Sequence, residues 1–376
     1  MSVLAAKQGL RDGDDMDFRE IKLADLRRGN IAENRVFHTN IWFKSINNTR
    51  YAELLPILDR VDSLMLRCTD RRIIRGIQFR ALNRSIGAHG RLLFQQAARR
   101  YRYGFITNTR HIPFAAFPVV VDMDDPYFTE DEVRTLRSSR QIAALVVTNQ
   151  AAADRYRELG VTCPIHVIGH GLRTVEPDPG VLEDVRHHKK PGELTVGYAA
   201  AWHLCDQDRG PDPMYNVTHL VEEVWPGVVA ACPQARLWLI GGVGKVLGRR
   251  LAGRPDVELV GHVPAEHVPA YLTAFDVGLY PRRIQHERSS VKVAQYLGCG
   301  VPVVGYRSVP TELISGAGSG IIVDSPEEFL AALVRLLRDP ALRAQQSTRA
   351  RAAARQVSWD VLGARYRALL EDVLPQ

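Results

Sequence analysis

Short, uninterrupted apolar segments recur along the second half of the chain and constrain its fold more than any other feature. They read LTVGYA (194–199), ARLWLIG (235–241), DVELV (256–260), FDVGLY (275–280), VPVVGY (301–306) and SGIIVD (319–324). Valine-rich runs of this length are typical of strands that are buried on both faces. Amphipathic segments, such as 216–232 and 264–275, separate them. This alternation predicts a parallel sheet with right-handed crossovers and helices on both sides.

The first half repeats the pattern more loosely, so we expect a second domain of the same kind. Its predicted strands are 35–43, 62–67, 103–107, 118–122, 143–148 and 164–169. The segment 173–193 contains prolines and many charges but no apolar period, and we interpret it as a linker. The predicted domains are therefore 1–172 and 194–355, followed by an amphipathic helix within 356–376.

Composition fits a two-domain protein of the cytoplasm. The 376 residues are 45% hydrophobic and 24% charged, with no apolar run long enough for a membrane span and no signal-peptide pattern at the start. The five cysteines are scattered and form no C-x-x-C pair. This spacing argues against a disulfide framework or a zinc ribbon.

The net charge of +7 comes with arginine clusters in TDRRIIRGIQFRALNR (69–84) and QQAARRYRYG (95–104). One interpretation is that these arginines lie on solvated helix faces. The alternative is a surface that contacts an anionic membrane, at its inner face, or a phosphorylated acceptor. No nucleic-acid partner is expected, because no recognition motif accompanies the arginines.

The segment HERSSVKVAQYLGCGVPVV (286–304) carries the strongest functional pattern. A helix should begin near Ser289 or Ser290, both good N-cap residues, and a helix start attracts anions such as phosphate. Glu287, just before that helix, is suited to accept hydrogen bonds from neutral hydroxyl groups. Lys292, Gln295 and Tyr296 fall within about one turn of each other, so Gln295 can share a helix face with Lys292 or with Tyr296. A phosphate with a hydroxyl-rich group next to it describes a nucleotide sugar.

These residues resemble the E-x7-E signature of the retaining glycosyltransferases of family 4, which have the GT-B fold. Glu287 matches the first glutamate, Gln295 stands at the second, and AQYLGCGVPVV is similar to the family's EAMACGVPVV. ARLWLIGG, DVELVGHVPAEHVPAYLTAFDVGLYP, SVPTELISGAGSGIIVDSPEEF and SWDVLGARYRALL also resemble family segments. The resemblance implies an α/β protein of the GT-B type, with two Rossmann-like domains whose parallel sheets face a central cleft. It also implies that the last helix packs back on the first domain.

The implied activity is transfer of a sugar from a nucleotide-sugar donor to an acceptor, with retention of configuration, no metal and no cofactor. Glu287 and Lys292 would be the catalytic residues, with Glu287 holding hydroxyls of the donor sugar. Gln295 would hold the ribose, while Val263 and its neighbours would contact the base. The further donor-side candidates are Ser289, Ser290, Gly242, His262, Arg282, Arg283 and Arg209, and the acceptor-side candidates in domain 1–172 are Asp124, Asp125 and His170. The acceptor itself stays open between a glycan, a lipid-linked sugar and a small molecule.

Four departures from the family pattern qualify this prediction. Gln295 replaces a glutamate, which exchanges a charge-assisted hydrogen bond for a neutral one. The usual Arg-x4/5-Lys pair is absent; Lys292 is the best substitute, ahead of Arg209, Arg282, Arg283 and Lys245. Asp124 or Asp125 stands where the family often has a histidine. The chain opens with an apparent helix at 2–13 instead of a strand and a glycine-rich loop.

Several competing interpretations accompany this one. DMDD (122–125) could hold a metal, although a strand end followed by a capping box, Thr129-x-x-Glu132, is favoured. GGVGKV (241–246) lacks the spacing and the Ser or Thr of a P-loop, and is interpreted as a turn lining the donor site. At the level of function, the alternatives are a GT-B scaffold that has lost catalysis and binds nucleotide or a partner, and a Rossmann-type oxidoreductase. The oxidoreductase is disfavoured because no G-x-G-x-x-G follows a strand.

Overall fold

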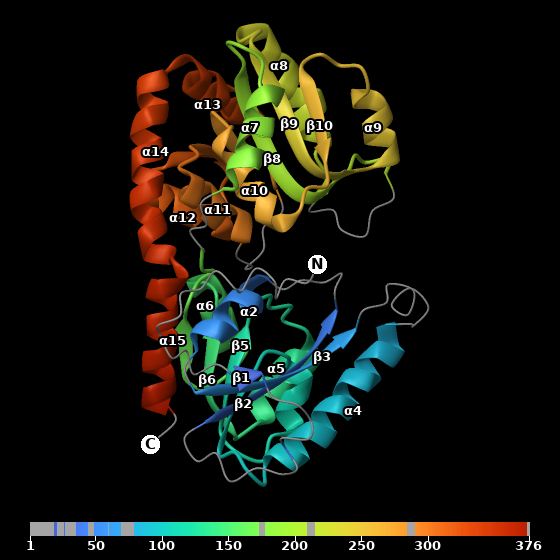
Figure 1. Cartoon of the computed structure of the whole chain (residues 1–376), viewed down its shortest axis with the longest axis vertical. Helices are drawn as coiled ribbons and strands as arrows, with labels where there is room; N and C mark the ends of the chain where they lie inside the picture. The colour runs from blue at the N-terminus through green and yellow to red at the C-terminus, as the bar shows by residue number, and fades with distance from the viewer. Residues whose placement is uncertain are drawn as a thin grey trace. The chain divides into compact units, whose positions relative to one another are not determined.

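The structure, a computed structural model, describes residues 19–20, 26, 35–43, 49–58, 60–68, 79–172, 177–208, 215–283 and 290–373. The chain forms two compact units (Figure 1). Unit 1 comprises Met1–Ile168 together with Leu362–Gln376, and unit 2 comprises Gly169–Val361. The predicted opening helix at 2–13 lies outside the described residues.

Unit 1 is built on a parallel sheet that, within the described residues, has seven strands in the order β1-β3-β2-β4-β5-β6-β7. The strands are β1 Arg19–Glu20, β2 Val36–Phe43, β3 Val61–Cys68, β4 Tyr103–Ile106, β5 Val119–Met123, β6 Ile142–Val147 and β7 Ile165–Val167. The chain pairs β2 with β3 on one side and with β4 on the other. The strand order therefore reverses between β2 and β4.

Amphipathic helices cover this sheet because their apolar faces match the strands' buried side chains. They are α2 Thr49–Leu54, η2 Leu55–Ile57, α4 Phe79–Ala97, η3 Thr109–Phe114, α5 Glu130–Ser138 and α6 Gln150–Glu158. Phe94 of α4, Leu136 of α5 and Tyr156 of α6 share one core with Val119 and Val121 of β5. At the start of α5 the Thr129 side chain accepts from the Glu132 N–H, as the predicted capping box requires, while the Glu132 carboxylate accepts from the Phe128 N–H.

Unit 2 contains a second parallel sheet, with six strands among the described residues in the order β10-β9-β8-β11-β12-β13. The strands are β8 Leu194–His203, β9 Ala235–Val243, β10 Val257–Gly261, β11 Val277–Tyr280, β12 Val303–Tyr306 and β13 Gly320–Val323. Each of the twelve strands predicted from the sequence coincides with an observed strand, with ends that agree within four residues. The predicted α/β fold with two parallel sheets is confirmed.

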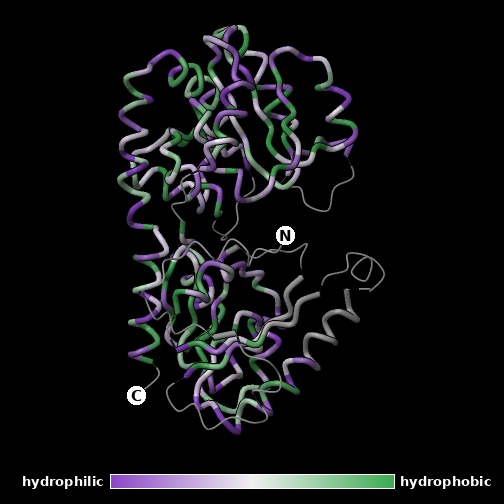
Figure 2. Tube along the Cα trace, in the orientation of Figure 1, coloured by the Kyte–Doolittle hydropathy of each residue, from purple (hydrophilic) through white to green (hydrophobic). Residues whose placement is uncertain are grey.

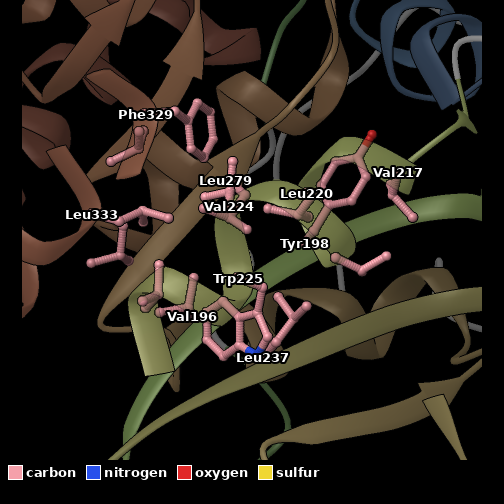
Figure 3. Packing of buried hydrophobic residues seen from close by; sticks show 14 of the residues in the cluster. Val196, Tyr198, Val217, Leu220, Val224, Trp225, Leu237, Leu279, Phe329 and Leu333 are labelled. Atoms are coloured by element: carbon pink, nitrogen blue, oxygen red, sulfur yellow. The ribbon is translucent and has the colours of Figure 1, made fainter. Parts of the chain in front are cut away.

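Helices pack on both faces of the second sheet. Its helices are α7 Pro179–His188, η5 Leu220–Val224, α8 Trp225–Ala231, α9 Lys245–Leu251, η6 Ala265–His267, α10 Val268–Thr273, α11 Val291–Cys299, α12 Val309–Ala317, α13 Pro326–Arg338, α14 Pro340–Ala354, η7 Arg355–Val357 and the start of α15 Trp359–Val373. Leu237 and Leu239 of β9 face η5, α8, α9 and α13, as Figure 3 shows in part, while Trp238 and Ile240 face α7, α10, α11, α12 and α14. Alternate residues of one strand thus enter opposite cores, which explains the unbroken apolar runs.

The segment 173–193 is not an extended connector throughout. Asp178 caps α7 by accepting hydrogen bonds from the Gly180 and Val181 N–H groups. Val185 on the same helix is buried among the residues of the α10 and α11 face. A single buried face on a ten-residue helix gives too short an apolar period to be recognised in a charged sequence, which is why the sequence pattern suggested a linker.

A buried ion pair ties α15 into unit 1. The Arg50 guanidinium lies 3.4 Å from the Asp122 carboxylate and 3.8 Å from that of Asp124, and it donates to the Ile168 carbonyl at 3.0 Å. The Tyr366 hydroxyl of α15 accepts from Arg50 and donates to Asp122. The side chains of Arg50 and Asp122 are fully buried. Burial raises the pKa of Asp122, while Arg50 and Tyr366 oppose that rise.

Polar and apolar residues are distributed as this layering requires. Figure 2 shows hydrophobic residues concentrated along the strands of each unit and hydrophilic ones along the outer helices. Every helix within the described ranges is too short or too polar to cross a bilayer.

Substitution Arg50→Met should destabilise unit 1 by about 3–5 kcal/mol, because it leaves the Asp122 charge buried without its main partner. Urea unfolding followed by circular dichroism measures this loss. The matched control is Arg155→Met on α6, whose ion pair with Glu158 is largely exposed. The control should cost no more than about 1 kcal/mol. Equal costs for both substitutions would contradict the structural role given to the buried pair.

Candidate functional site

The carboxyl edge of the second sheet is the place where its topology opens a crevice. From the central strand β8 the chain builds outward through β9 and β10, then returns to add β11 on the other side of β8. Loops that follow β8 and β11 therefore diverge at this edge. In open parallel sheets such a switch point is where ligands bind.

The functional segment predicted from the sequence starts at this switch point. β11 ends at Tyr280, and α11 begins at Val291 with Ser290 as its N-cap, as predicted. The Ser290 side chain makes no capping hydrogen bond to the helix, so the first N–H groups are not satisfied by it. Glu287, Ser289 and, in another loop, Arg209 lie outside the described residues.

Lys292, in the first turn of α11, sits in an aromatic and cationic setting. Its Nζ lies 4.9 Å from the centre of the Tyr198 ring of β8. Arg282, which follows β11, donates from Nε to the Tyr198 hydroxyl at 3.3 Å. Burial, and then the charge of Arg282, holds the pKa of Lys292 well below its usual value. No described carboxylate forms an ion pair with Lys292. Two cationic side chains thus converge on β8 and β11, where an anion would relieve their repulsion.

The other residues of α11 differ in role: some side chains are buried in the unit 2 core, and others are partly exposed at the edge of the sheet. Tyr296 is buried, and its hydroxyl donates to the Leu279 carbonyl of β11 at 3.2 Å and accepts from the Ala199 N–H of β8 at 3.4 Å. Gln295 is only partly buried and stands one turn beyond Lys292. Gly300 ends the helix with φ of 68°, which favours glycine, as expected for the turn into β12. Of the two predicted neighbours of Gln295, Lys292 therefore remains available to a ligand and Tyr296 does not.

Arg283, the residue after Arg282, points to a different neighbourhood. Its guanidinium lies 5.8 Å from the centre of the Tyr306 ring at the end of β12. His219, the residue directly before η5, packs against the same ring with 5.5 Å between the ring centres. Burial and the charge of Arg283 lower the pKa of His219 to about 4, so this imidazole is neutral at physiological pH. Arg282 and Arg283 therefore contact neighbouring but separate parts of the carboxyl edge.

An aromatic platform occupies the other half of the edge, over β8, β9 and β10. Trp202 of β8 is 46% exposed, and its ring meets that of His262 edge to face at 5.3 Å. Gly242 of β9 lies directly against both: a Cβ there would come within 2.6 Å of either ring. The predicted donor-side residues Gly242 and His262 are therefore brought together, with Val263 next in the chain. An exposed tryptophan beside a glycine floor offers a flat surface for a planar ring.

The glycine-rich turn GGVGKV does not bind phosphate through the start of α9. The Asp208 carboxylate already occupies that helix start, accepting hydrogen bonds from the Val246 and Leu247 N–H groups at 2.7 and 3.1 Å. It also accepts from the Cys205 N–H, and these backbone donors lower the pKa of Asp208. Lys245 is exposed on the same turn. A P-loop would bind phosphate at this helix start, which the Asp208 carboxylate occupies instead. The structure therefore agrees with the prediction that GGVGKV is not a P-loop.

The acceptor-side candidates are divided between the two units. Asp124 follows β5 in unit 1 and lies within 3.8 Å of the buried Arg50, so it takes part in a structural ion pair. Asp125 beside it is exposed. His170 belongs by its contacts to unit 2 and not to the unit that contains Asp124 and Asp125. No group of three or more His, Cys, Asp or Glu side chains suited to a metal ion is found in the described part of the chain.

Two residues of this edge were not among the sequence predictions. Trp202 and Tyr198 both come from β8, within YAAAWHL. The available signal was an aromatic residue near the carboxyl end of a buried strand, where a parallel sheet binds its ligands. The strand was predicted to end at residue 199, three residues before Trp202, which hid that signal.

Solved structures resemble the chain over most of its length at low identity. HepE of Anabaena, solved with UDP and glucose, is 15% identical with a TM-score of 0.68, over 90% of this chain and 99% of HepE. Sucrose-phosphate synthase of Thermosynechococcus elongatus is 15% identical with a TM-score of 0.66, over 90% and 99%. WaaG, a glycosyltransferase involved in lipopolysaccharide biosynthesis, is 14% identical with a TM-score of 0.64, over 89% and 99%. This likeness confirms the predicted GT-B fold.

Sequence comparison adds a more specific finding for unit 2. No curated protein sequence matches the chain. Residues 210–339 match the family model described as Glycosyl transferases group 1. That segment runs from before η5 through α13 and includes Arg282, Lys292 and Gln295. Unit 2 therefore contains a segment that is similar to the group 1 glycosyltransferases, and the predicted enzyme class is confirmed.

Proposed function

We propose that this protein transfers a sugar from a nucleotide-sugar donor to an acceptor, with retention of configuration and without a metal ion. The carboxyl edge of the unit 2 sheet is the donor site. The observation that carries the proposal is the pair Lys292 and Arg282, two cationic side chains held at the switch point beside the start of α11. A cationic crevice of this kind fits a diphosphate.

The diphosphate would be bound by three features that act together. Lys292 and Arg282 supply positive charge, and the start of α11 supplies N–H groups that the Ser290 side chain does not cap and the positive end of the helix dipole. In this proposal they replace the Arg/Lys pair of the resembling family. Their charge would also stabilise the diphosphate as it departs, when negative charge develops on it, which is the main way such a site lowers the reaction barrier.

The nucleobase would lie on the platform made by Trp202, His262 and Gly242. The platform and the cations lie on the same edge, β9 and β10 carrying one and β11 the other, with β8 between them. A base on the platform would therefore place its ribose and phosphates toward α11, where Gln295 can hold the ribose hydroxyls. The HepE structures contain UDP or UDP-glucose, which supports a uridine nucleotide as the first donor to test.

The sugar and the acceptor complete the proposal. Glu287, by its resemblance to the family glutamate, would hold hydroxyls of the donor sugar. The acceptor would be bound by unit 1, and a glycan, a lipid-linked sugar and a small molecule are the classes to test. No protein nucleophile is required when the leaving diphosphate is stabilised electrostatically and the acceptor attacks from the same face.

Calorimetric titration with UDP, GDP, ADP and dTDP, each alone and as a sugar conjugate, tests the donor assignment. We expect one nucleotide to bind, Glu287→Ala to weaken its conjugate more than the bare nucleotide, and Gln295→Glu to change both alike. Turnover of the bound conjugate in the presence of acceptors completes the test. Absence of binding to every nucleotide would refute the donor site. Binding without turnover would favour the scaffold that has lost catalysis.

Substitution Trp202→Ala should weaken the nucleotide roughly tenfold to a hundredfold, because stacking of a base on an aromatic ring is worth about 1–3 kcal/mol. Binding of inorganic pyrophosphate to the same variant should be unchanged, since pyrophosphate has no base to stack. Titration of both ligands gives the comparison. Trp202→Phe, which keeps a flat ring, is the matched control. Equal losses for nucleotide and pyrophosphate would show that Trp202 supports the fold and not the base.

Lys292 predicts a proton linkage with a definite sign. Its pKa is lowered in the free protein, and a bound diphosphate would raise it by favouring the charged amine. Nucleotide binding should then take up a proton, and affinity should fall by up to about tenfold per pH unit as pH rises from the pKa of the free amine towards that of the bound amine. Titrations in two buffers of different ionisation enthalpy measure the uptake. Lys292→Arg should abolish it while binding persists, because arginine stays protonated. Proton uptake that survives in this variant would assign the linkage to another group.

A further inference from the structure

Positive charge is concentrated in one part of unit 1. Residues 71–121 contain ten arginines and no lysine, aspartate or glutamate. The whole chain carries a net charge of +7, so the residues outside this segment together carry −3. The positive balance of the protein therefore comes from a single stretch that includes α4, the turn after it, β4 and η3.

The second half of α4 turns one polar face outward. Arg91, Leu92, Gln95 and Arg99 are exposed, and the helical repeat places these positions on one side. The opposite side is buried in the unit 1 core through residues such as Phe94. Leu92 is 54% exposed, so an apolar side chain stands out among the arginines. We call Arg91, Leu92 and Gln95 of α4, together with Arg99 in the turn directly after it, the outer face of α4.

The arginines of this face are not neutralised within the part of the chain that the structure describes. Arg91 and Arg99 form no ion pair there. By contrast, Arg134 on α5 and Arg155 and Arg157 on α6 of the same unit each pair with a carboxylate three residues away. Such pairing is how a merely solvated helix face usually balances its charge. The outer face of α4 lacks it because its whole neighbourhood in sequence has no carboxylate.

We propose that the outer face of α4 docks on an anionic phospholipid surface. Arg91 and Arg99 are eight residues apart, about 12 Å along a helix, too far to hold one phosphate but suited to a plane of many headgroups. An aromatic residue that could stack on a nucleic-acid base is missing from the described part of this face. The lone exposed Leu92 can enter the headgroup layer, while one leucine is too little apolar surface for a protein partner. This surface lies in unit 1 and does not depend on the donor site of unit 2.

The attraction should be electrostatic and therefore sensitive to salt. At about 0.1 M salt, electrostatic interactions are screened over about 10 Å. The arginines are therefore attracted to a membrane only when they lie close to its surface. Each arginine near an anionic leaflet contributes severalfold to the affinity. A protein bound in this way would meet acceptors that are themselves anchored in the membrane.

Co-sedimentation of the full chain with lipid vesicles tests the proposal. We expect binding to vesicles of phosphatidylcholine mixed with phosphatidylglycerol, loss of that binding at high salt, and no binding to phosphatidylcholine alone. Arg91→Gln combined with Arg99→Gln should weaken binding about tenfold or more. The control is Arg155→Gln combined with Arg157→Gln, which removes the same charge from α6 and should leave vesicle binding unchanged.

Three outcomes would overturn the proposal: equal binding to neutral and anionic vesicles, equal losses in both double variants, or binding to single-stranded RNA with none to vesicles. The last would assign the basic segment to a nucleic acid. Nucleotide titration of the same α4 variant should match the parent protein, because these arginines lie outside the donor site. Failure of vesicle binding and failure of donor binding can therefore be told apart.

Discussion

The parallel pairing of β8 with β9 on one side and β11 on the other is the constraint on which the rest of unit 2 depends. Asp276 holds the start of this register: its carboxylate accepts from the Thr195 N–H at 2.8 Å and from Lys189 at 2.7 Å, and its own N–H donates to the Thr195 carbonyl. With β8 central, the loops after β8 and β11 must part at the carboxyl edge. The cations and the aromatic platform both come from those divergent loops and their neighbours.

The proposed donor site has an electrostatic cost that a purely structural core would avoid. A partly buried lysine beside an arginine is destabilising when it is charged in the free protein, and this cost appears as the lowered pKa of Lys292. The same arrangement pre-organises positive charge for an anionic ligand, so that little rearrangement is needed when it binds. Tyr198 supports both groups, with its ring against Lys292 and its hydroxyl accepting from Arg282.

Buried charge in unit 1 has the opposite character. Arg50 is surrounded by Asp122, Asp124, Tyr366 and a backbone carbonyl, so its charge is compensated where it lies. Because Tyr366 is on α15, this cluster joins the end of the chain to a strand in its first third. Arg91 and Arg99, which form no ion pair within the described residues, are instead on the outside of unit 1. The two units thus carry positive charge in different settings: Lys292 and Arg282 at the carboxyl edge of the unit 2 sheet, and Arg91 and Arg99 on the outside of unit 1.

The sequence by itself determined the strands, the parallel α/β class and the helix that begins after Ser290, because both-face burial leaves continuous valine-rich runs and helix starts carry local signals. It also identified Gly242, His262, Arg282 and Lys292 as donor-side candidates. Only the tertiary structure showed that Lys292 and Arg282 meet at Tyr198, that Trp202 joins Gly242 and His262, that Asp208 fills the start of α9, and that Asp124 is engaged by Arg50. The physical reason is that a strand can be recognised from the local periodicity of its residues. The contacts named above, in contrast, join residues far apart in the chain, and the order in which the strands pair decides which of these residues come close.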